Sequence, residues 1–267
     1  MNLRRRLLKK KGFILIASVI LIVFAAIVII GTTTFIVQRL SQNQAYQLRS
    51  KCIYLAQAGI HDALYWYRYR DISANGYFSL GKTNLDANNF FVLGANAVEL
   101  LMVNTNGSYL YPPTGNTKYR YLYGLTIQNA TNSKTITIDR MVVTWNNSRR
   151  LSTIRINGSN RWTGTARSPA DCDISNFTLN TTPSIYNIDY LQFDNNMSGA
   201  TISIQFVMSD SSTKTLTVFP PSQNYSFTIN STGKTTGSNI YRTVKATYNA
   251  LTAKVTTYDE TNTEITP

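Results

Sequence analysis

"LLKKKGFILIASVILIVFAAIVIIG", residues 7–31, places a long apolar run directly behind a basic cluster and a single glycine. Between Phe13 and Ile30 the only polar residue is Ser18. At about 1.5 Å rise per residue, roughly twenty such residues span the hydrocarbon core of a bilayer as a helix. The run therefore predicts a transmembrane helix over about residues 13–37.

The positive charge of the chain is concentrated in front of this run. The 267 residues carry a formal net charge of +13, and six of the 26 Lys and Arg residues lie in the first twelve positions, which contain no acid. Because Lys and Arg are retained on the cytoplasmic side, the amino terminus is expected inside and the chain after about residue 38 outside. The other 20 basic and 13 acidic residues form no dense basic stripe, so nucleic acid is not an expected partner.

The stretch that follows, residues 38–69, contains no proline and one glycine, and it predicts more helix. Apolar or small residues recur at helical spacing and form one stripe, made of Leu48, Cys52, Leu55, Gly59 and Ala63. The membrane helix is therefore expected to continue to about Tyr69, a length of roughly 85 Å. Such a helix needs partners beyond the bilayer, either a globular domain or copies of itself.

Two ordinary interpretations compete for the apolar run. A secretory signal peptide fits less well, because its apolar region is about 7–15 residues long and ends at a small-residue cleavage site, which is not evident here. A simple uncleaved anchor is the alternative, and on topology alone it is the preferred interpretation.

The junction Lys10-Lys11-Gly12-Phe13 resembles the class III leader of type IV pilins and type II secretion pseudopilins. The resemblance implies that a prepilin peptidase in the membrane cuts between Gly12 and Phe13 on the cytoplasmic face. It also implies N-methylation of Phe13, with Lys9, Lys10 and Lys11 as the leader charges, and retention of the apolar helix in the mature chain. A glycine suits a cleavage site because it has no side chain to obstruct a protease.

Two further positions bear on this resemblance. "YLAQAGIHDAL", residues 54–64, is similar to the A-E-A-G stretch of many minor pilins, with Gln57 where glutamate is commoner. Most pilins carry a glutamate at the fifth mature position, which is Ala17 here. The missing carboxylate implies a minor, tip-proximal or initiating subunit, since repeated loss of a charge pair in a low-dielectric medium is costly. The alternative is that the chain is no pilin and Ala17 is one more apolar anchor residue.

Downstream, residues 70–107 give no clear pattern, and the rest of the chain predicts many short strands. Residues 119–128 and 135–145 are expected to form an antiparallel hairpin. Further strands are predicted at 151–158, 174–179, 185–193, 200–208, 213–219, 225–230, 241–249 and 253–260. Strands this short and regular favour a β-sandwich over a parallel sheet.

The predicted fold class is therefore α+β: a long N-terminal helix followed by an antiparallel β-rich region. We expect a cleaved basic leader over 1–12, the helix over 13–69, a pilin-like region over 70–150 and a sandwich-like domain over 151–267. In this layout a small sheet covers the outer helix and is extended or interrupted by the larger sandwich.

Candidate chemistry is sparse, so no enzyme activity and no cofactor are expected. The only histidine, His61, is predicted on the outer helix in a surface or packing role. Cys52 and Cys172 would share an oxidising compartment and leave two alternatives open, a disulfide or two unpaired thiols. Asp171 and Asp173 are a weak calcium candidate, with a solvated loop as the default.

Two functions remain in competition. The first is a minor pilin or pseudopilin that initiates, caps or functionalises a filament. Its implied partners are other pilin subunits, the prepilin peptidase and the inner-membrane assembly platform, and it would pass from the inner membrane into an extracytoplasmic filament. The second is a membrane-anchored sandwich that binds glycans or surfaces without polymerising, a role that suits the 17 tyrosines and 11 phenylalanines of the chain.

Overall fold

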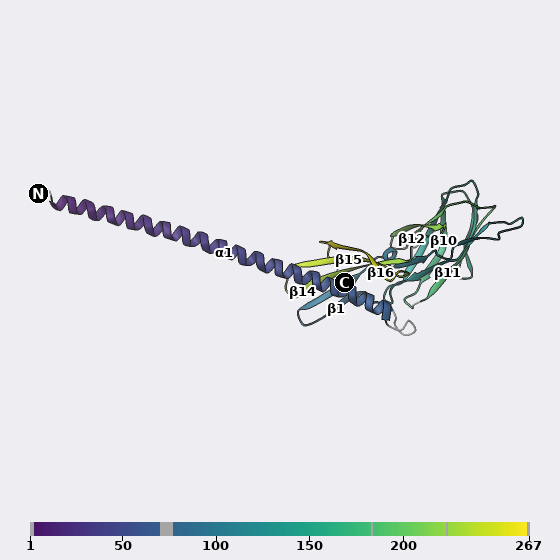
Figure 1. Cartoon of the computed structure of the whole chain (residues 1–267), viewed down its shortest axis with the longest axis horizontal. Coiled ribbons are helices and arrows are strands. Elements are labelled where there is room, and N and C mark those ends of the chain that lie inside the picture. Colours follow the sequence, from purple (N-terminus) through teal and green to yellow (C-terminus); the bar gives the residue numbers. More distant parts are fainter. Residues whose placement is uncertain (1–2, 70–76, 183, 223, 266–267) are drawn as a thin grey trace. The chain divides into compact units, whose positions relative to one another are not determined.

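The computed structural model describes residues 3–69, 77–182, 184–222 and 224–265, and for residues 3–14 it describes the backbone alone. The chain divides into two compact units, which we call the N-terminal unit, Met1–Ser50, and the folded unit, Lys51–Pro267. The helix α1 (Leu3–Tyr69) contributes to both (Figure 1). The predicted helix is confirmed, and it begins earlier than expected, within the predicted leader.

The β-branched stretch at residues 32–34 does not interrupt α1, because its hydroxyls bond within the helix. Thr33 Oγ1 and Thr34 Oγ1 each donate to a carbonyl oxygen four residues earlier at 2.8 Å, and Thr32 Oγ1 donates to the Val28 carbonyl at 2.9 Å. A threonine that bonds back to its own helix exposes no unpaired hydroxyl. The polar interruption is therefore compatible with an apolar environment.

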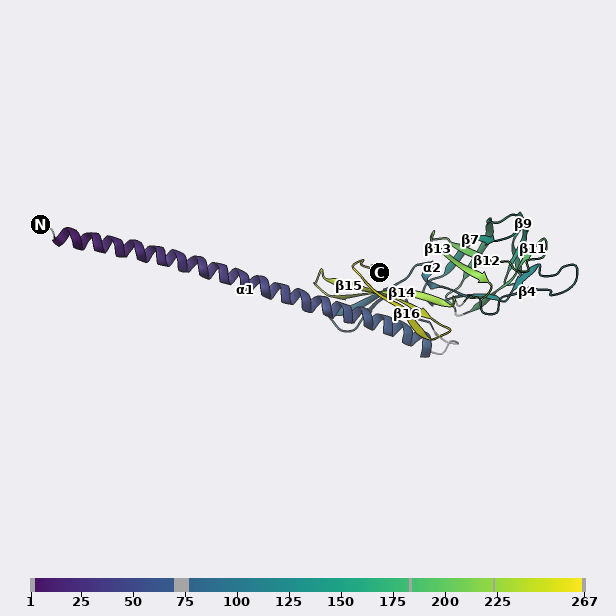
Figure 2. The ribbon, with the colours of Figure 1, turned by 45° about the horizontal axis from the view of Figure 1, so that its top comes forward.

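A five-stranded antiparallel sheet packs against the Lys51–Tyr69 part of α1 in the folded unit (Figure 2). It has the order β1-β2-β14-β15-β16. Its strands are β1 (Gly81–Asn84), β2 (Asn89–Gly94), β14 (Ser226–Thr235), β15 (Tyr241–Asn249) and β16 (Lys254–Thr261).

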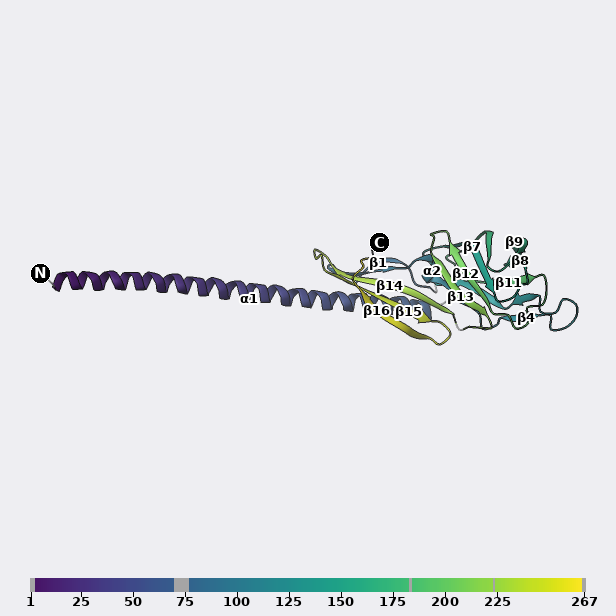
Figure 3. The same ribbon diagram turned by 90° about the horizontal axis from the view of Figure 1, so that it is seen from above.

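The chain between β2 and β14 forms a β-sandwich, which Figure 3 shows as a group of strands separate from β14–β16. A short helix, α2 (Ala97–Leu100), leads into it. One sheet is four-stranded, in the order β10-β7-β12-β13. Its strands are β7 (Ile136–Trp145), β10 (Ala170–Leu179), β12 (Ile202–Met208) and β13 (Thr213–Phe219).

The other sheet of the sandwich is seven-stranded. It has the order β3-β6-β11-β5-β4, with β8 paired to β11 and β9 paired to β8. Its strands are β3 (Leu101–Asn104), β4 (Tyr109–Tyr111), β5 (Tyr121–Tyr123), β6 (Leu125–Asn129), β8 (Leu151–Ile156), β9 (Ser159–Ala166) and β11 (Ile185–Phe193).

Apolar residues that alternate along the strands fill the space between the two sheets. Trp145 on β7 meets Phe193 on β11 edge to face, with ring centroids 5.3 Å apart. Phe177 and Tyr186 make a second such contact across the sheets at 5.2 Å. The same hydrophobic core continues through α2 to Ile60 on α1, so the folded unit has one connected interior. The α+β fold class and the predicted sandwich are both confirmed.

The predicted hairpin between 119–128 and 135–145 is wrong. β6 pairs with β3 and β11 in the seven-stranded sheet, whereas β7 pairs with β10 and β12 in the four-stranded sheet. The loop between them crosses the sandwich, and Asn129 Nδ2 holds it by donating to the Lys134 carbonyl at 2.7 Å. Each strand buries one face, so its alternation fits a sandwich crossing as well as a hairpin.

The sheets also do not follow the expected division at residue 150. β14–β16, which lie after it, join β1 and β2 in one sheet, and β3–β7, which lie before it, belong to the sandwich. The sequence reasoning missed β1 to β4 and β9. β1, β3 and β4 are only three or four residues long, and β9 is largely polar and exposed. β2 has six residues and a buried apolar centre, so its Phe-Phe-Val-Leu run was a signal that could have found it.

Candidate functional site

The predicted processing site lies where the structure describes only helical backbone. Gly12, Phe13 and the leader charges Lys9, Lys10 and Lys11 fall within residues 3–14. Their side chains are therefore outside the described residues. Cleavage and N-methylation at this junction stay predictions.

The apolar part of α1 in the N-terminal unit is exposed from Leu15, where the description of side chains begins, to Leu40. Ala17 is exposed, and so are Ile20, Ile29 and Phe35, each of them more than half accessible. Among the described residues, one helix, Leu15–Tyr69, is long and apolar enough to cross a membrane or to serve as a signal. Apolar side chains exposed on all sides of a helix require lipid or other helices around them.

The outer part of α1 packs very closely against the five-stranded sheet. A Cβ atom added at Gly59 would lie 2.2 Å from Ser231 Oγ and 2.7 Å from Phe91 Cδ2. A Cβ added at Gly233 on β14 would lie 2.0 Å from the Cys52 carbonyl oxygen. Glycine at both positions therefore lets the helix and the strand approach each other. The predicted stripe is buried here at Cys52, Leu55, Gly59 and Ala63.

The two cysteines of the chain are free and buried in different places. Cys52 lies on α1, where its thiol donates to the Ile240 carbonyl at 3.3 Å, and Cys172 lies on the inward face of β10. Burial raises the pKa of Cys172 to about 12, and it also raises the pKa of Cys52. Of the two alternatives, the structure shows unpaired thiols, in their unreactive protonated form.

The weak calcium candidate is an exposed pair of acids on the outer face of the four-stranded sheet. Asp171 forms an ion pair with Arg140 at 3.1 Å, and Asp173 lies two residues farther along β10. Within the described part of the chain, no three His, Cys, Asp or Glu side chains are grouped so that they could hold a metal ion. His61 is exposed on α1.

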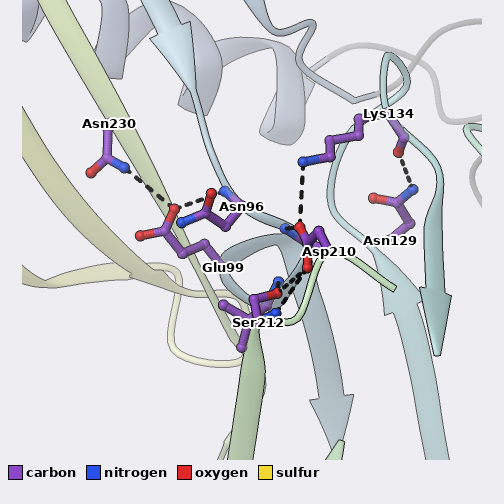
Figure 4. Close-up of polar contacts among 9 residues, drawn as sticks. Asn96, Glu99, Asn129, Lys134, Asp210, Ser212 and Asn230 are labelled. Carbon is purple, nitrogen blue, oxygen red and sulfur yellow. Dashed lines mark hydrogen bonds and ion pairs between the residues drawn. The ribbon is translucent and has the colours of Figure 1, made fainter. Parts of the chain in front are cut away.

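A polar joint, which sequence reasoning missed, connects the five-stranded sheet to the sandwich around α2 (Figure 4). Asp210, in the β12–β13 turn, accepts a hydrogen bond from Ala97 N at 3.1 Å, and Ser212 Oγ accepts one from Val98 N at 3.2 Å. These contacts satisfy amides that a helix leaves unpaired at its start. Burial raises the pKa of Asp210, but its hydrogen bonds with Ser212 and Ala97 and the charge of Lys134 outweigh burial and hold the pKa below its ordinary value.

Glu99 fixes the other side of the same joint. Its Oε2 atom accepts hydrogen bonds from Asn96 N at 2.9 Å and from Asn230 Nδ2 on β14 at 3.3 Å. Its Oε1 atom lies 3.2 Å from Lys245 Nζ on β15. The joint therefore bonds to the sandwich through Asp210 and to the five-stranded sheet through Glu99, and its carboxylates serve structure.

The chain passes between the five-stranded sheet and the sandwich twice, once on the way to β3 and once on the way to β14. Lys214, on β13, forms hydrogen bonds with both of these passages. Its ammonium donates to the Leu101 carbonyl at 2.5 Å, where β3 begins, and to the Ser226 carbonyl at 3.2 Å, where β14 begins. Burial lowers the pKa of Lys214 to about 8. The bridging ammonium therefore loses its proton just above neutral pH.

A cluster of tyrosines covers part of the outer face of the seven-stranded sheet. We call it the tyrosine face, and it consists of Tyr109, Tyr111, Tyr121, Tyr123 and Tyr190. The other four ring centroids lie 5.7 to 6.0 Å from that of Tyr123. The repeated Tyr-Leu-Tyr at 109–111 and 121–123, with period two, is the sequence signal that could have found it.

Comparison with protein-family models, with curated proteins and with solved structures gave no match. Function therefore has to be inferred from the residues of the chain itself. What is established is a pilin-like architecture, in which a long apolar N-terminal helix is followed by antiparallel sheets that pack against its outer part.

Proposed function

We propose that this protein is a minor pilin or pseudopilin, a subunit that initiates, caps or functionalises a membrane-anchored filament. The observation that supports this most strongly is the difference in exposure between the two parts of α1. Its outer part is covered by the five-stranded sheet, whereas the apolar side chains from Leu15 to Leu40 are exposed. In a filament subunit, lipid covers such apolar side chains before assembly, and the helices of neighbouring subunits cover them afterwards.

Ala17 supports a minor subunit over the main component of a filament. A methyl group cannot neutralise the terminal ammonium of a neighbouring subunit, and a buried unpaired charge costs several kcal/mol in such surroundings. One such defect in a filament is tolerable, whereas a defect at every contact is not. Ala17 is equally compatible with an ordinary membrane anchor, so cleavage of the leader has to be measured to separate the two functions.

The experiment compares two glycine-to-valine variants of α1 expressed with the prepilin peptidase of the native host. We expect Gly12→Val to keep residues 1–12, because a branched side chain at the cut obstructs the peptidase. Gly31→Val is the matched control, since a Cβ there meets nothing within 4 Å, and it should mature like the wild type. Intact-mass measurement should find a mature chain that begins at N-methylated Phe13.

The same variants, expressed in the native host, test whether the protein is a minor subunit. The measurement is quantitative mass spectrometry of sheared filaments. We expect the wild-type chain at a small fraction of the main subunit, and Gly12→Val absent from the filaments. Normal maturation of Gly12→Val would contradict the peptidase assignment. A wild-type chain that dominates the filaments would contradict the minor role.

The second candidate function is a membrane-anchored binding module, and the tyrosine face is the observation that favours it. If the mature protein keeps its first twelve residues and is absent from filaments, this module becomes the better account.

A further inference from the structure

The tyrosine face forms an ordered surface with polar neighbours in register. Across one row, Tyr111 on β4 lies opposite Tyr121 on β5, which lies opposite Gln192 on β11, and Gln192 lies opposite Thr153 on β8. Of the leucines between the tyrosines, Leu122 is fully inaccessible and Leu110 is partly buried. Strand alternation therefore directs every ring of the row outward.

A second row runs parallel to the first. Tyr109 lies opposite Tyr123, whose ring centroid is 5.9 Å from that of Tyr190, and Tyr190 lies opposite Arg155 on β8. Arg155 lies 3.7 Å from Asp189, so its charge is compensated within the protein. The surface is therefore aromatic on β4, on β5 and at Tyr190 of β11, and hydrogen-bonding at Gln192 of β11 and on β8. The residues of the two rows, with Asp189, carry no net charge.

The rings are held in place by one another. Tyr109 and Tyr123 are stacked at an interplanar angle of 21°, whereas Tyr121 and Tyr190 meet edge to face at 5.4 Å. Tyr109 and Tyr111, on the strand at the end of the sheet, are half exposed, and the other three rings are partly buried among them. Such a surface loses little conformational freedom when a ligand binds.

The chemistry of this surface matches a neutral carbohydrate. A pyranose ring gathers C–H groups on one side and carries hydroxyls around its edge, so it needs an aromatic face together with planar polar side chains. Tyrosine supplies the ring and a hydroxyl, and Gln192 supplies both a donor and an acceptor. The outward positions of these two rows carry no aliphatic side chain of the kind that anchors a helix or a strand of another protein.

The size of the surface also favours a carbohydrate over a protein. The tyrosine face with Gln192, Thr153 and Arg155 comprises eight residues. A stable protein interface uses about 20 to 30 residues a side. A short oligosaccharide is covered by a surface of this extent.

We propose that the tyrosine face is a binding site for a neutral glycan, with the rings of β4 and β5 under the sugar C–H groups and Gln192 and Thr153 on its hydroxyls. The site lies on the seven-stranded sheet, whereas filament assembly concerns α1. It therefore does not rest on the proposed function, and it holds for a filament subunit and for a simple anchored module.

The test uses the full chain in lauryldimethylamine oxide, a detergent without a sugar headgroup, on an immobilised panel of neutral hexose and N-acetylhexosamine oligosaccharides with sialylated counterparts. We expect binding to neutral members of the panel. The double variant Tyr109→Ser/Tyr111→Ser should weaken that binding about tenfold or more, because two ring contacts are lost. Tyr54→Ser removes a tyrosine of α1 that is still more exposed than these two, and it should leave binding unchanged.

Tyr109→Phe/Tyr111→Phe guards against a folding artefact, because it keeps both rings and should retain most of the binding. Failure of the wild-type chain to bind any neutral glycan would overturn the proposal, and so would full binding by the serine double variant. Preference for the sialylated probes contradicts a neutral site. Concentration-dependent self-association that the serine variant abolishes, without glycan binding, would identify the surface as a contact between copies.

Discussion

The two parts of α1 belong to the same helix, yet the same residue type is exposed in one part and buried in the other. Ile29 in the N-terminal unit is 63% exposed, whereas Ile60 in the folded unit is 2% exposed. The first part is apolar on all sides, and the second is apolar mainly on the stripe that faces the five-stranded sheet. Side-chain type alone therefore does not reveal what stabilises a segment, because one isoleucine depends on its own fold and the other on an external apolar environment.

The largest expected effect comes from truncating the two isoleucines. Ile60→Ala should lower the free energy of unfolding of the folded unit by about 3 kcal/mol, since it leaves a cavity between α1 and the sheet. Ile29→Ala is the matched variant in the N-terminal unit and should leave that free energy unchanged. Denaturant unfolding of the full chain in detergent, followed by near-ultraviolet circular dichroism, measures both. Equal losses would break the contrast between the two parts of the helix.

The two glycines of α1 in these parts provide a second, smaller test. Gly59→Ala should destabilise the folded unit by about 2 kcal/mol, because the added methyl group meets Ser231 and the buried ring of Phe91. Gly31→Ala adds the same methyl group where nothing lies within 4 Å. It should therefore leave the unfolding midpoint where it is. A Gly59→Ala variant as stable as the wild type would show that α1 does not pack this closely on the sheet.

The apolar part of α1 and the folded unit also differ in charge. Residues 13–38 carry no charged side chain, whereas the folded unit holds the Lys214 ammonium between the two chain passages. The pKa of Lys214 is about 8 in the folded state, below its unfolded value, so the unfolded state binds more protons between these values. Lys214 should therefore raise the free energy of unfolding by about 1 kcal/mol between pH 7.5 and 9, relative to a variant without this amine.

The Lys214→Met variant should lack this contribution, because methionine has no group that titrates. Denaturant unfolding at several pH values in this window checks the difference between the two proteins. The difference between the two proteins is used because Cys52 and Cys172 act in the opposite direction in both. Burial raises the pKa of each thiol, so each lowers the stability as the pH rises through the ordinary thiol range of about 8.5. An identical pH dependence of the two proteins would show that Lys214 is not buried between the passages.

Local pattern was sufficient for the helix and for most of the strands. The absence of proline and the apolar stripe predicted α1, and alternation predicted β11, β13 and β15 with the bounds that the structure shows. The β12–β13 and β15–β16 hairpins pair strands that follow one another in the chain. Each of these features depends on residues close together in the sequence.

Candidate sites were less visible because they depend on distant residues. The tyrosine face joins Tyr109 to Tyr190, and the polar joint connects α2 to Asp210 and Asn230. For Cys52 and Cys172 the sequence left a disulfide and two unpaired thiols open, and only the fold places them in separate packing environments as free thiols. The type of a residue determines which chemistry its side chain can perform, whereas the tertiary structure determines which residues lie next to it.

The sequence by itself determined the long apolar helix, its buried outer stripe and the presence of an antiparallel β-rich region. Only the tertiary structure decided that β14–β16 return to β1 and β2, that β6 and β7 lie in different sheets, and that five tyrosines meet on one face. The physical reason is that helical hydrogen bonds and alternating side chains are local, so a pattern fixes which face of an element is buried. Strand pairing joins residues far apart in the chain, and several pairings bury the same apolar faces equally well.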